Sequence, residues 1–241
     1  MKPIRIFSHA TSEPPGYILK LLIQFGYPYE LVCLEDGKQV PMNLDTVSAL
    51  IFMGGVGNVN QPTEWMCQEM TLIQRATEKN IPVLGICLGA QLLSKSLGGR
   101  VWQADNVEVG WHDVHLLPAA SNHPWFIDLP PHFTVFQWHA HVFSPPSGAI
   151  SMATSECTAC QAFTMGNSLA VQLHLENSAK VIKNLIHKFS SDLIGESNCV
   201  QSREQILMNI SNHCQQAFDI ADKLLGPWIH SVFNKSQPDQ T

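Results

Sequence analysis

The chain has 241 residues, of which 45% are hydrophobic and 14% are charged, and its formal net charge is -6 at pH 7. This composition is typical of a globular protein with a full core, and it excludes a disordered chain. There is no run of basic residues and no apolar segment long enough to span a bilayer, so neither nucleic acid nor a membrane is an expected partner. We expect a small-molecule substrate or another protein instead.

The seven cysteines follow no regular framework, and the N-terminus lacks the pattern of a signal peptide. We therefore expect free thiols in a reducing compartment and a cytoplasmic protein. Cys157 and Cys160 form a C-x-x-C pair without a second pair of metal ligands, which favours a structural or incidental role. Four cysteines are predicted to be inert core residues: Cys33, Cys67, Cys199 and Cys214.

The first part of the chain alternates between strand and helix patterns. In chain order we predict a strand at 4–7, a helix at 17–24, strands at 29–33 and 49–53, a helix at 63–79, a strand at 81–86 and a helix at 88–97. Such alternation is typical of βαβ units, which build a parallel sheet with right-handed crossovers.

The second part of the chain first changes to strand patterns with short connections, which indicate antiparallel strands added to the main sheet. These strands are predicted at 107–117, 132–138, 150–153, 161–164 and 169–173. The chain from Ser178 onward is predicted to be mostly helical, with a break at about 195–198.

The predicted fold class is α/β, in one domain over residues 1–241. We expect a three-layer, flavodoxin-like, open twisted sheet that is mostly parallel and has helices on both faces. The added antiparallel strands and a helical C-terminal extension over about 178–241 complete this prediction.

The strongest functional signal is the segment Gly85-Ile86-Cys87-Leu88-Gly89, between a predicted buried strand and a predicted helix. A cysteine flanked by glycines in this context is typical of a nucleophile elbow, a sharp turn that exposes the nucleophile at the end of the strand. The glycines remove Cβ atoms that would collide in such a turn. The start of the helix favours the reactive thiolate. Cys87 is therefore the candidate nucleophile.

A thiolate nucleophile needs a base and a group that orients the base. Among eleven histidines, His174 stands at the end of a predicted strand and is followed two residues later by Glu176. Residues two apart in an extended chain face the same side, so Glu176 can hold the imidazole of His174. The order of cysteine, histidine and acid differs from that of an α/β-hydrolase, in which the acid precedes the histidine.

The third component is the turn Met53-Gly54-Gly55-Val56-Gly57, which follows a predicted strand. Glycines let backbone N–H groups approach a developing oxyanion closely, and one such donor contributes about 3 kcal/mol to transition-state stabilisation. We predict an oxyanion hole formed by the N–H groups of Gly55 and Leu88.

With these motifs in place, the chain resembles the class I (triad) glutamine amidotransferases, above all in the run PVLGICLGAQLLSKSLGGRV. It looks most like their stand-alone, GMP-synthase-like members, whose pattern the segments FQWH at 136–139 and CQAF at 160–163 fit. The resemblance extends to about Glu176 and is weaker in the tail.

The resemblance implies a glutaminase reaction with Cys87 as nucleophile, His174 as acid and base, and Glu176 as the residue that orients His174. It also implies that Gln91 recognises glutamine. A loop whose backbone holds the α-amino and α-carboxylate groups of the substrate is expected to contain Trp138, His139, Ala140 and His141.

Two residues depart from the family pattern, and Ala140, together with Trp138, leaves the substrate open. Leu175 stands where proline is usual and loosens the turn without removing a catalytic group, and Ala140 stands where glycine is common. One alternative is a γ-glutamyl peptidase with the same triad. Another is a non-catalytic regulatory or binding protein, against which the intact triad argues.

Partners and cofactors are expected to be few. The chain has no phosphate-binding loop, so we expect either a synthetase partner subunit or ammonia that is released without being channelled to an acceptor. We predict no cofactor and no metal site, and the sequence does not indicate an oligomeric state.

Overall fold

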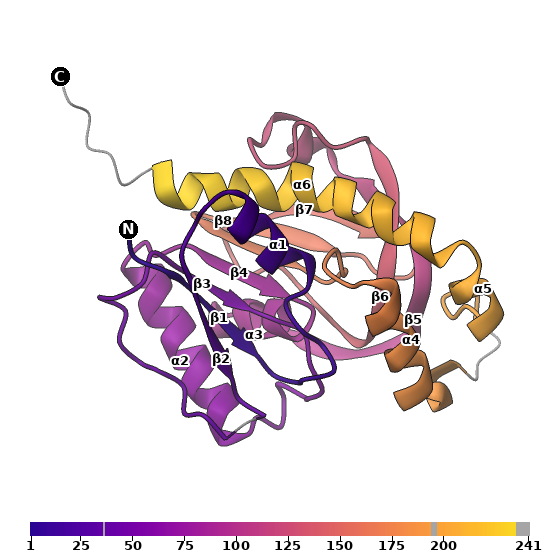
Figure 1. Ribbon diagram of the computed structural model, residues 1–241, viewed down its shortest axis with the longest axis horizontal. Helices are drawn as coiled ribbons and strands as arrows, with labels where there is room; N and C mark the ends of the chain where they lie inside the picture. Colours follow the sequence, from indigo (N-terminus) through magenta and orange to yellow (C-terminus); the bar gives the residue numbers. More distant parts are fainter. Residues whose placement is uncertain (36, 194–196, 235–241) are drawn as a thin grey trace.

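The described residues contain nine strands, which form one sheet (Figure 1). The computed structural model describes residues 1–35, 37–193 and 197–234. The strands are β1 (Ile4–Ser8), β2 (Tyr29–Cys33), β3 (Ala49–Phe52), β4 (Val83–Ile86), β5 (Val101–Leu116), β6 (His132–Phe143), β7 (Ile150–Ser155), β8 (Ala162–Met165) and β9 (Ser168–Val171). Their order across the sheet is β2-β1-β3-β4-β9-β8-β7-β5-β6.

One side of the sheet is parallel. β1 pairs with β2 and β3, β3 pairs with β4, and β4 pairs with β9, in each case in parallel. Every residue of β1, β3 and β4 is buried, because helices cover both faces of these strands. The carboxyl ends of β3 and β4 therefore lie side by side at one edge of the sheet.

The other side of the sheet is antiparallel, from β9 through β8, β7 and β5 to β6. β5 and β6 are longer than the sequence predicts, because they pair along most of their length. Their register shifts between Gln103 and Glu108, so that His141 pairs with Gln103 and His139 with Glu108. Trp138 to His141, predicted as a loop, therefore belongs to β6, and this part of the prediction was wrong.

The helices cover the two faces of the sheet. α1 (Tyr17–Gln24), α4 (Ala179–Lys188) and α6 (Ile210–Asn234) pack on one face, and α2 (Glu64–Glu78) and α3 (Leu88–Ser96) on the other. Figure 1 shows α6 lying along α1 across the sheet, where the rings of Tyr17 and Phe218 stack 4.2 Å apart. The predicted α/β fold with helices on both faces, added antiparallel strands and a helical C-terminal region is confirmed, although its sheet is evenly mixed.

Short elements complete the C-terminal region. They are η2 (Ser190–Leu193) and α5 (Arg203–Leu207), and a further 3-10 helix, η1 (Pro118–Asn122), follows β5. Residues 195 and 196 of the predicted break lie outside the described residues. The single domain over 1–241 stays a prediction. Within the described ranges, no helix is long and apolar enough to cross a membrane.

The cysteines differ from the prediction of free, inert thiols. Cys157, after β7, forms a disulfide with Cys199, which stands 42 residues further along the chain. The segment before α5 runs beside β5, where the Val109 N–H donates to the Cys199 carbonyl at 2.8 Å, and this places the two cysteines together. Cys67 is exposed and Cys33 is partly exposed, whereas Cys214 is buried as predicted. The disulfide removes the thiol argument for a reducing compartment.

The turn from β4 into α3 depends on two glycines. A Cβ on Gly85 would lie 2.4 Å from the Gly89 carbonyl oxygen, and a Cβ on Gly89 would lie 2.0 Å from the Phe52 carbonyl oxygen. Since both contacts are to backbone, no side-chain rearrangement can relieve them. The glycines thus let α3 pack directly against the end of β3, as the elbow motif predicts.

We expect Gly89→Ala to lower the free energy of unfolding by about 1–3 kcal/mol, because the new methyl group overpacks the contact with Phe52. Asn184→Ala, on the exposed face of α4, is the matched control and should change it by less than about 0.5 kcal/mol. Equilibrium urea unfolding measures both. Equal stability of the two variants would contradict the close packing of α3 on β3.

Candidate active site

Cys87 occupies a strained turn at the end of β4. Its φ angle is 50° and its ψ angle -106°, in a backbone region that a residue with a side chain rarely adopts. Its N–H donates to the Val171 carbonyl at 2.8 Å, and Leu88, the next residue, begins α3. Such strain costs about 1–3 kcal/mol and is concentrated at functional sites. The turn therefore has the geometry that the sequence predicts for a nucleophile.

His174 and Glu176 lie just beyond the end of β9 and contact each other. The His174 N–H donates to the Phe136 carbonyl at 2.9 Å, which extends the strand locally. The ring Nδ1 donates to Glu176 Oε1 at 2.7 Å, and both side chains are almost fully buried. Since Glu176 engages Nδ1, Nε2 is the nitrogen left to face Cys87.

The electrostatics of His174 follow from these neighbours. Burial alone would lower the pKa of His174, but the carboxylate of Glu176 and the sulfur of Cys87 raise its pKa well above the ordinary value of 6.5. The imidazolium is therefore favoured. A protonated imidazole beside a thiol sulfur can deliver a proton to a departing group, which is the chemistry that thiol-based acyl transfer needs.

A cavity of about 300 Å³ opens above Cys87. This volume lies at the lower end of the range for small-molecule sites. The predicted site residues that line it are Gly55, Cys87, Leu88, Gln91, Trp138, His139, Ala140, His141 and His174. Glu176 does not line the cavity itself, but it is hydrogen-bonded to His174, which does. The structure thus brings all the predicted site residues to one place, and their catalytic and binding roles stay predictions.

Gln91 lies on α3, one helical turn after Cys87. Its side-chain amide donates to the His141 carbonyl at 3.2 Å and to Gln172 Oε1 at 3.4 Å. Gln172 in turn donates to Cys87 Sγ at 3.5 Å. A polar wall of amide groups therefore stands beside the nucleophile, and it can recognise a polar ligand.

Glu108 of β5 is a site component that the sequence did not indicate. Its Oε2 lies 3.0 Å from His139 Nε2, and its carboxylate accepts hydrogen bonds from Ser155, Thr158 and Gln161. Burial alone would raise the pKa of Glu108, but His139 and the hydroxyl donors lower it. Only the pairing of β5 with β6 brings this carboxylate to His139.

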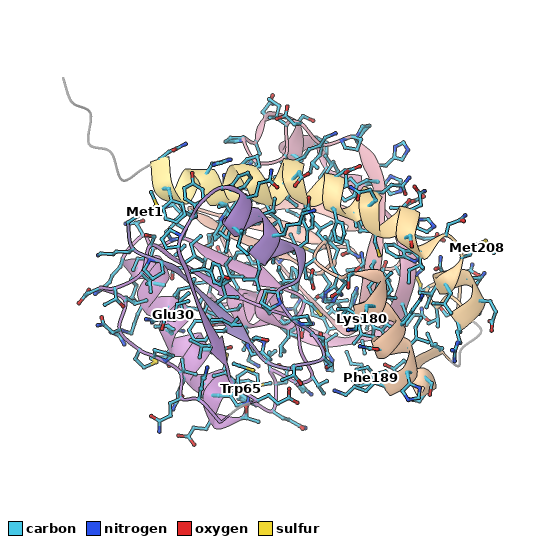
Figure 2. The ribbon with its side chains drawn as sticks, viewed as in Figure 1. Met1, Glu30, Trp65, Lys180, Phe189 and Met208 are labelled. Atoms are coloured by element: carbon cyan, nitrogen blue, oxygen red, sulfur yellow. A yellow bond between two sulfur atoms is a disulfide. The ribbon has the colours of Figure 1, made fainter. Side chains whose placement is uncertain are left out.

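His9 and Glu69 form a second missed pair, behind the glycine-rich turn after β3. His9 Nδ1 lies 3.1 Å from the Gly54 carbonyl oxygen and Nε2 lies 3.0 Å from Glu69 Oε2. A Cβ on Gly55 would lie 2.6 Å from the Cβ of His9, so the turn packs tightly on this ring. His9 also stacks on Trp65, which Figure 2 labels at the start of α2. The pair therefore supports the turn predicted to bind the oxyanion.

The cavity is also lined by Glu13, between β1 and α1, and by Leu185, Phe189 and Asp192 of the C-terminal region. No sequence motif indicated these residues. Within the described ranges, no group of three histidine, cysteine, aspartate or glutamate side chains could hold a metal ion.

Comparison with known proteins identifies the family. Residues 16–191 match the model of glutamine amidotransferase class I, and the chain belongs to this family. Over 192 residues it is 29% identical to the glutamine amidotransferase-like protein YfeJ of Salmonella typhimurium, covering 77% of this chain and 80% of that one. Over 185 residues it is 30% identical to a subunit of the glutamine-hydrolyzing GMP synthase of Sulfurisphaera tokodaii, covering 68% of this chain and 95% of that one.

A solved structure gives the same result. The crystal structure of a glutamine amido transferase from Methylobacillus flagellatus matches with a TM-score of 0.89 at 28% identity, covering 95% of each chain. The resemblance to GMP-synthase-like amidotransferases is thereby confirmed. The chain spans 37% of the GMP synthase of Thermomicrobium roseum and 43% of that of Thermosipho melanesiensis.

Replacing Glu176 with glutamine should lower the pKa of His174, because burial then acts against the charged imidazole with less opposition. NMR titration of the ring Cε1 resonance measures this shift. A raised pKa in the folded state stabilises the fold below pH 6.5, and this contribution is lost as pH rises through the folded value. The stability that the variant loses should therefore be greatest below pH 6.5, where His174 is charged and Glu176 is ionised, and should decrease as pH rises through the folded pKa of His174.

Glu78→Gln, at the exposed end of α2, is the matched control and should leave the His174 titration unchanged. An unchanged pKa of His174 in Glu176→Gln would contradict the role assigned to this ion pair.

Proposed function

We propose that the protein is a glutaminase that cleaves the γ-carboxamide of glutamine with Cys87, His174 and Glu176. The observation that carries this proposal is the meeting of a strained cysteine and a buried histidine–carboxylate pair at one cavity. Membership of the class I glutamine amidotransferase family supports it.

The reaction begins with attack of Cys87 Sγ on the γ-carbonyl carbon. The N–H groups of Gly55 and Leu88 stabilise the oxyanion, since both residues line the cavity beside the sulfur. His174 protonates the departing nitrogen, the C–N bond breaks, and a γ-glutamyl thioester remains. Water activated by His174 then hydrolyses the thioester to glutamate, and Glu176 orients the imidazole throughout.

Gln91 and the segment from Trp138 to His141 hold the amino-acid end of the substrate in this proposal. Gln91 donates to the His141 carbonyl, so its amide is held in one orientation beside the cavity. The backbone of β6 beside the register shift supplies the remaining polar groups. Relatives named as subunits of a glutamine-hydrolyzing GMP synthase support a synthetase partner that accepts the ammonia.

A second candidate function is hydrolysis of γ-glutamyl peptides by the same residues. The observation that favours it is that the cavity, of about 300 Å³, is also lined by Glu13, Leu185 and Phe189, which the glutaminase mechanism does not use. A purely regulatory role is disfavoured, because the triad geometry is intact.

Cys87→Ala should lower kcat/KM for glutamine by at least about 1,000-fold, because it removes the nucleophile. Ammonia release measures this, with Cys67→Ala, the exposed free cysteine of α2, as the matched control. Activity that survives in Cys87→Ala would refute the mechanism.

A substrate panel of glutamine, γ-glutamyl dipeptides and glutathione then separates the two candidate functions. The glutaminase proposal predicts the highest kcat/KM for glutamine. A higher value for a peptide would establish the second candidate in its place.

A further inference from the structure

Glu13 is a carboxylate in the cavity that the proposed mechanism does not use. It belongs to the connection between β1 and α1, where its N–H donates to the Ala10 carbonyl at 3.1 Å. Its Oε2 and the Cε1 atom of His174 each lie 3.1 Å from the position that a Cβ on Gly54 would occupy, and Cys87 Cβ lies 3.6 Å from it. The carboxylate therefore stands beside the reacting groups, in space that Gly54 leaves open.

Glu13 has a charge without a matching donor. No hydrogen bond to its carboxylate is formed by the described part of the chain, although the side chain is half-buried. Burial raises the pKa of Glu13, and the neighbouring His174 offsets part of that effect. A carboxylate that is partly removed from water and accepts no hydrogen bond is stabilised by a ligand that carries a hydrogen-bond donor.

The cavity lining also contains two apolar residues and a second acid from the C-terminal region. Leu185 and Phe189 contribute the apolar surface, and Figure 2 labels Phe189 at the C-terminal end of α4. Asp192 accepts a hydrogen bond from the indole N–H of Trp138 at 3.0 Å, which holds the acid in place. Within the described ranges, no lysine or arginine lines the cavity. The charge of His174 is balanced by Glu176, and the other charged residues of the lining are the acids Glu13 and Asp192, so the cavity favours a cation.

The residues that line the cavity have different neighbours. Gln91 donates to the His141 carbonyl, and there the proposed mechanism holds the amino-acid part of the substrate. Glu13 lies beside His174, which in that mechanism protonates the departing nitrogen. In the proposed mechanism, a group attached to that nitrogen starts beside Glu13, and Leu185 and Phe189 line the same cavity space.

We propose that this space is a subsite for leaving-group amines that carry a second, positively charged amino group, with Glu13 as the residue that selects them. This inference rests on the proposed function and adds γ-glutamyl amides of diamines to the substrates of the same site. The methylene chain of such an amine packs on Leu185 and Phe189, and its ammonium group donates to Glu13.

The chemistry is that of the proposed glutaminase with a larger leaving group. Cys87 Sγ forms a bond to the γ-carbonyl carbon, the C–N bond to the diamine breaks, and His174 gives its proton to the departing nitrogen. The diamine leaves with its distal ammonium group unchanged. Water then hydrolyses the thioester, so that γ-glutamyl amide and water give glutamate and diamine.

Lys188 places a positive charge near Glu13, outside the residues that line the cavity. It is exposed at the end of α4, donates to Ser12 Oγ at 3.2 Å and lowers the pKa of Glu13 through its charge. A second cation in the cavity would be repelled by it. Removal of this charge should therefore strengthen the selection of cationic leaving groups, in the direction opposite to removal of the Glu13 charge.

The test compares γ-glutamylputrescine with γ-glutamyl-n-pentylamide, in which a methyl group replaces the distal ammonium group at the same chain length. Steady-state kinetics give kcat/KM for each compound from the release of glutamate. A charge-assisted hydrogen bond predicts a preference of roughly 10-fold or more for γ-glutamylputrescine. Both compounds share the γ-glutamyl part, so the ratio reports on the leaving group alone.

Three variants sharpen the comparison. Glu13→Gln should reduce the preference to about one, Lys188→Met should increase it, and the exposed Glu78→Gln should leave it unchanged. A fall in kcat/KM by the same factor for both compounds in Glu13→Gln would show that Glu13 acts on the γ-glutamyl part, and would overturn the inference.

The outcomes also separate this inference from the proposed function. Hydrolysis of glutamine and of both amides without a preference overturns the subsite and leaves the glutaminase proposal intact. No hydrolysis of any of the three compounds overturns the proposed function and the subsite with it.

Discussion

The backbone turn at Cys87 is the constraint on which the rest of the site depends. Gly89 brings α3 against the end of β3, and the N–H of Cys87 binds the Val171 carbonyl of β9. The turn is thereby held between β3 and β9, the two strands that flank β4, and its positive φ angle is maintained by packing on both sides. Gly54, His174 and the β6 backbone are then placed around one sulfur atom because they follow, or pair beside, the same group of strands.

Among the described residues, three buried histidine–carboxylate pairs support the segments that meet at this turn. His174 pairs with Glu176, and the other two pairs are His9 with Glu69 and His139 with Glu108. Removal of one partner from a buried pair typically costs about 3–5 kcal/mol, because the remaining charge stays in a poorly solvated place. His9 and Glu69 hold the glycine-rich turn, and Glu108 holds His139 of β6. Glu176 holds His174 just beyond the end of β9. The three pairs thereby fix the parts of the site in their relative positions.

Local motifs predicted the fold well where one segment carried the whole signal. The alternation of apolar runs and helical patterns predicted the order of β1 to β4 and α1 to α3, since burial of a parallel strand on both faces leaves a continuous apolar run. The lengths of β5 and β6 were underestimated, because their pairing with each other and the register shift at Glu108 involve residues far apart in sequence. The Cys157–Cys199 disulfide was missed for the same reason.

The sequence by itself determined the chemistry of the candidate site: a cysteine in a glycine-flanked turn, a histidine with a glutamate two residues later, and a glycine-rich turn after a strand. Each of these motifs lies within a few residues, so local geometry suffices to predict it. Tertiary structure alone decided that Glu13 lines the cavity, that Glu108 contacts His139 of its lining and that Glu69 pairs with His9 behind the glycine-rich turn. A lone carboxylate in a sequence carries no sign of its neighbours, because its burial and its charge partners are created only when distant strands pair.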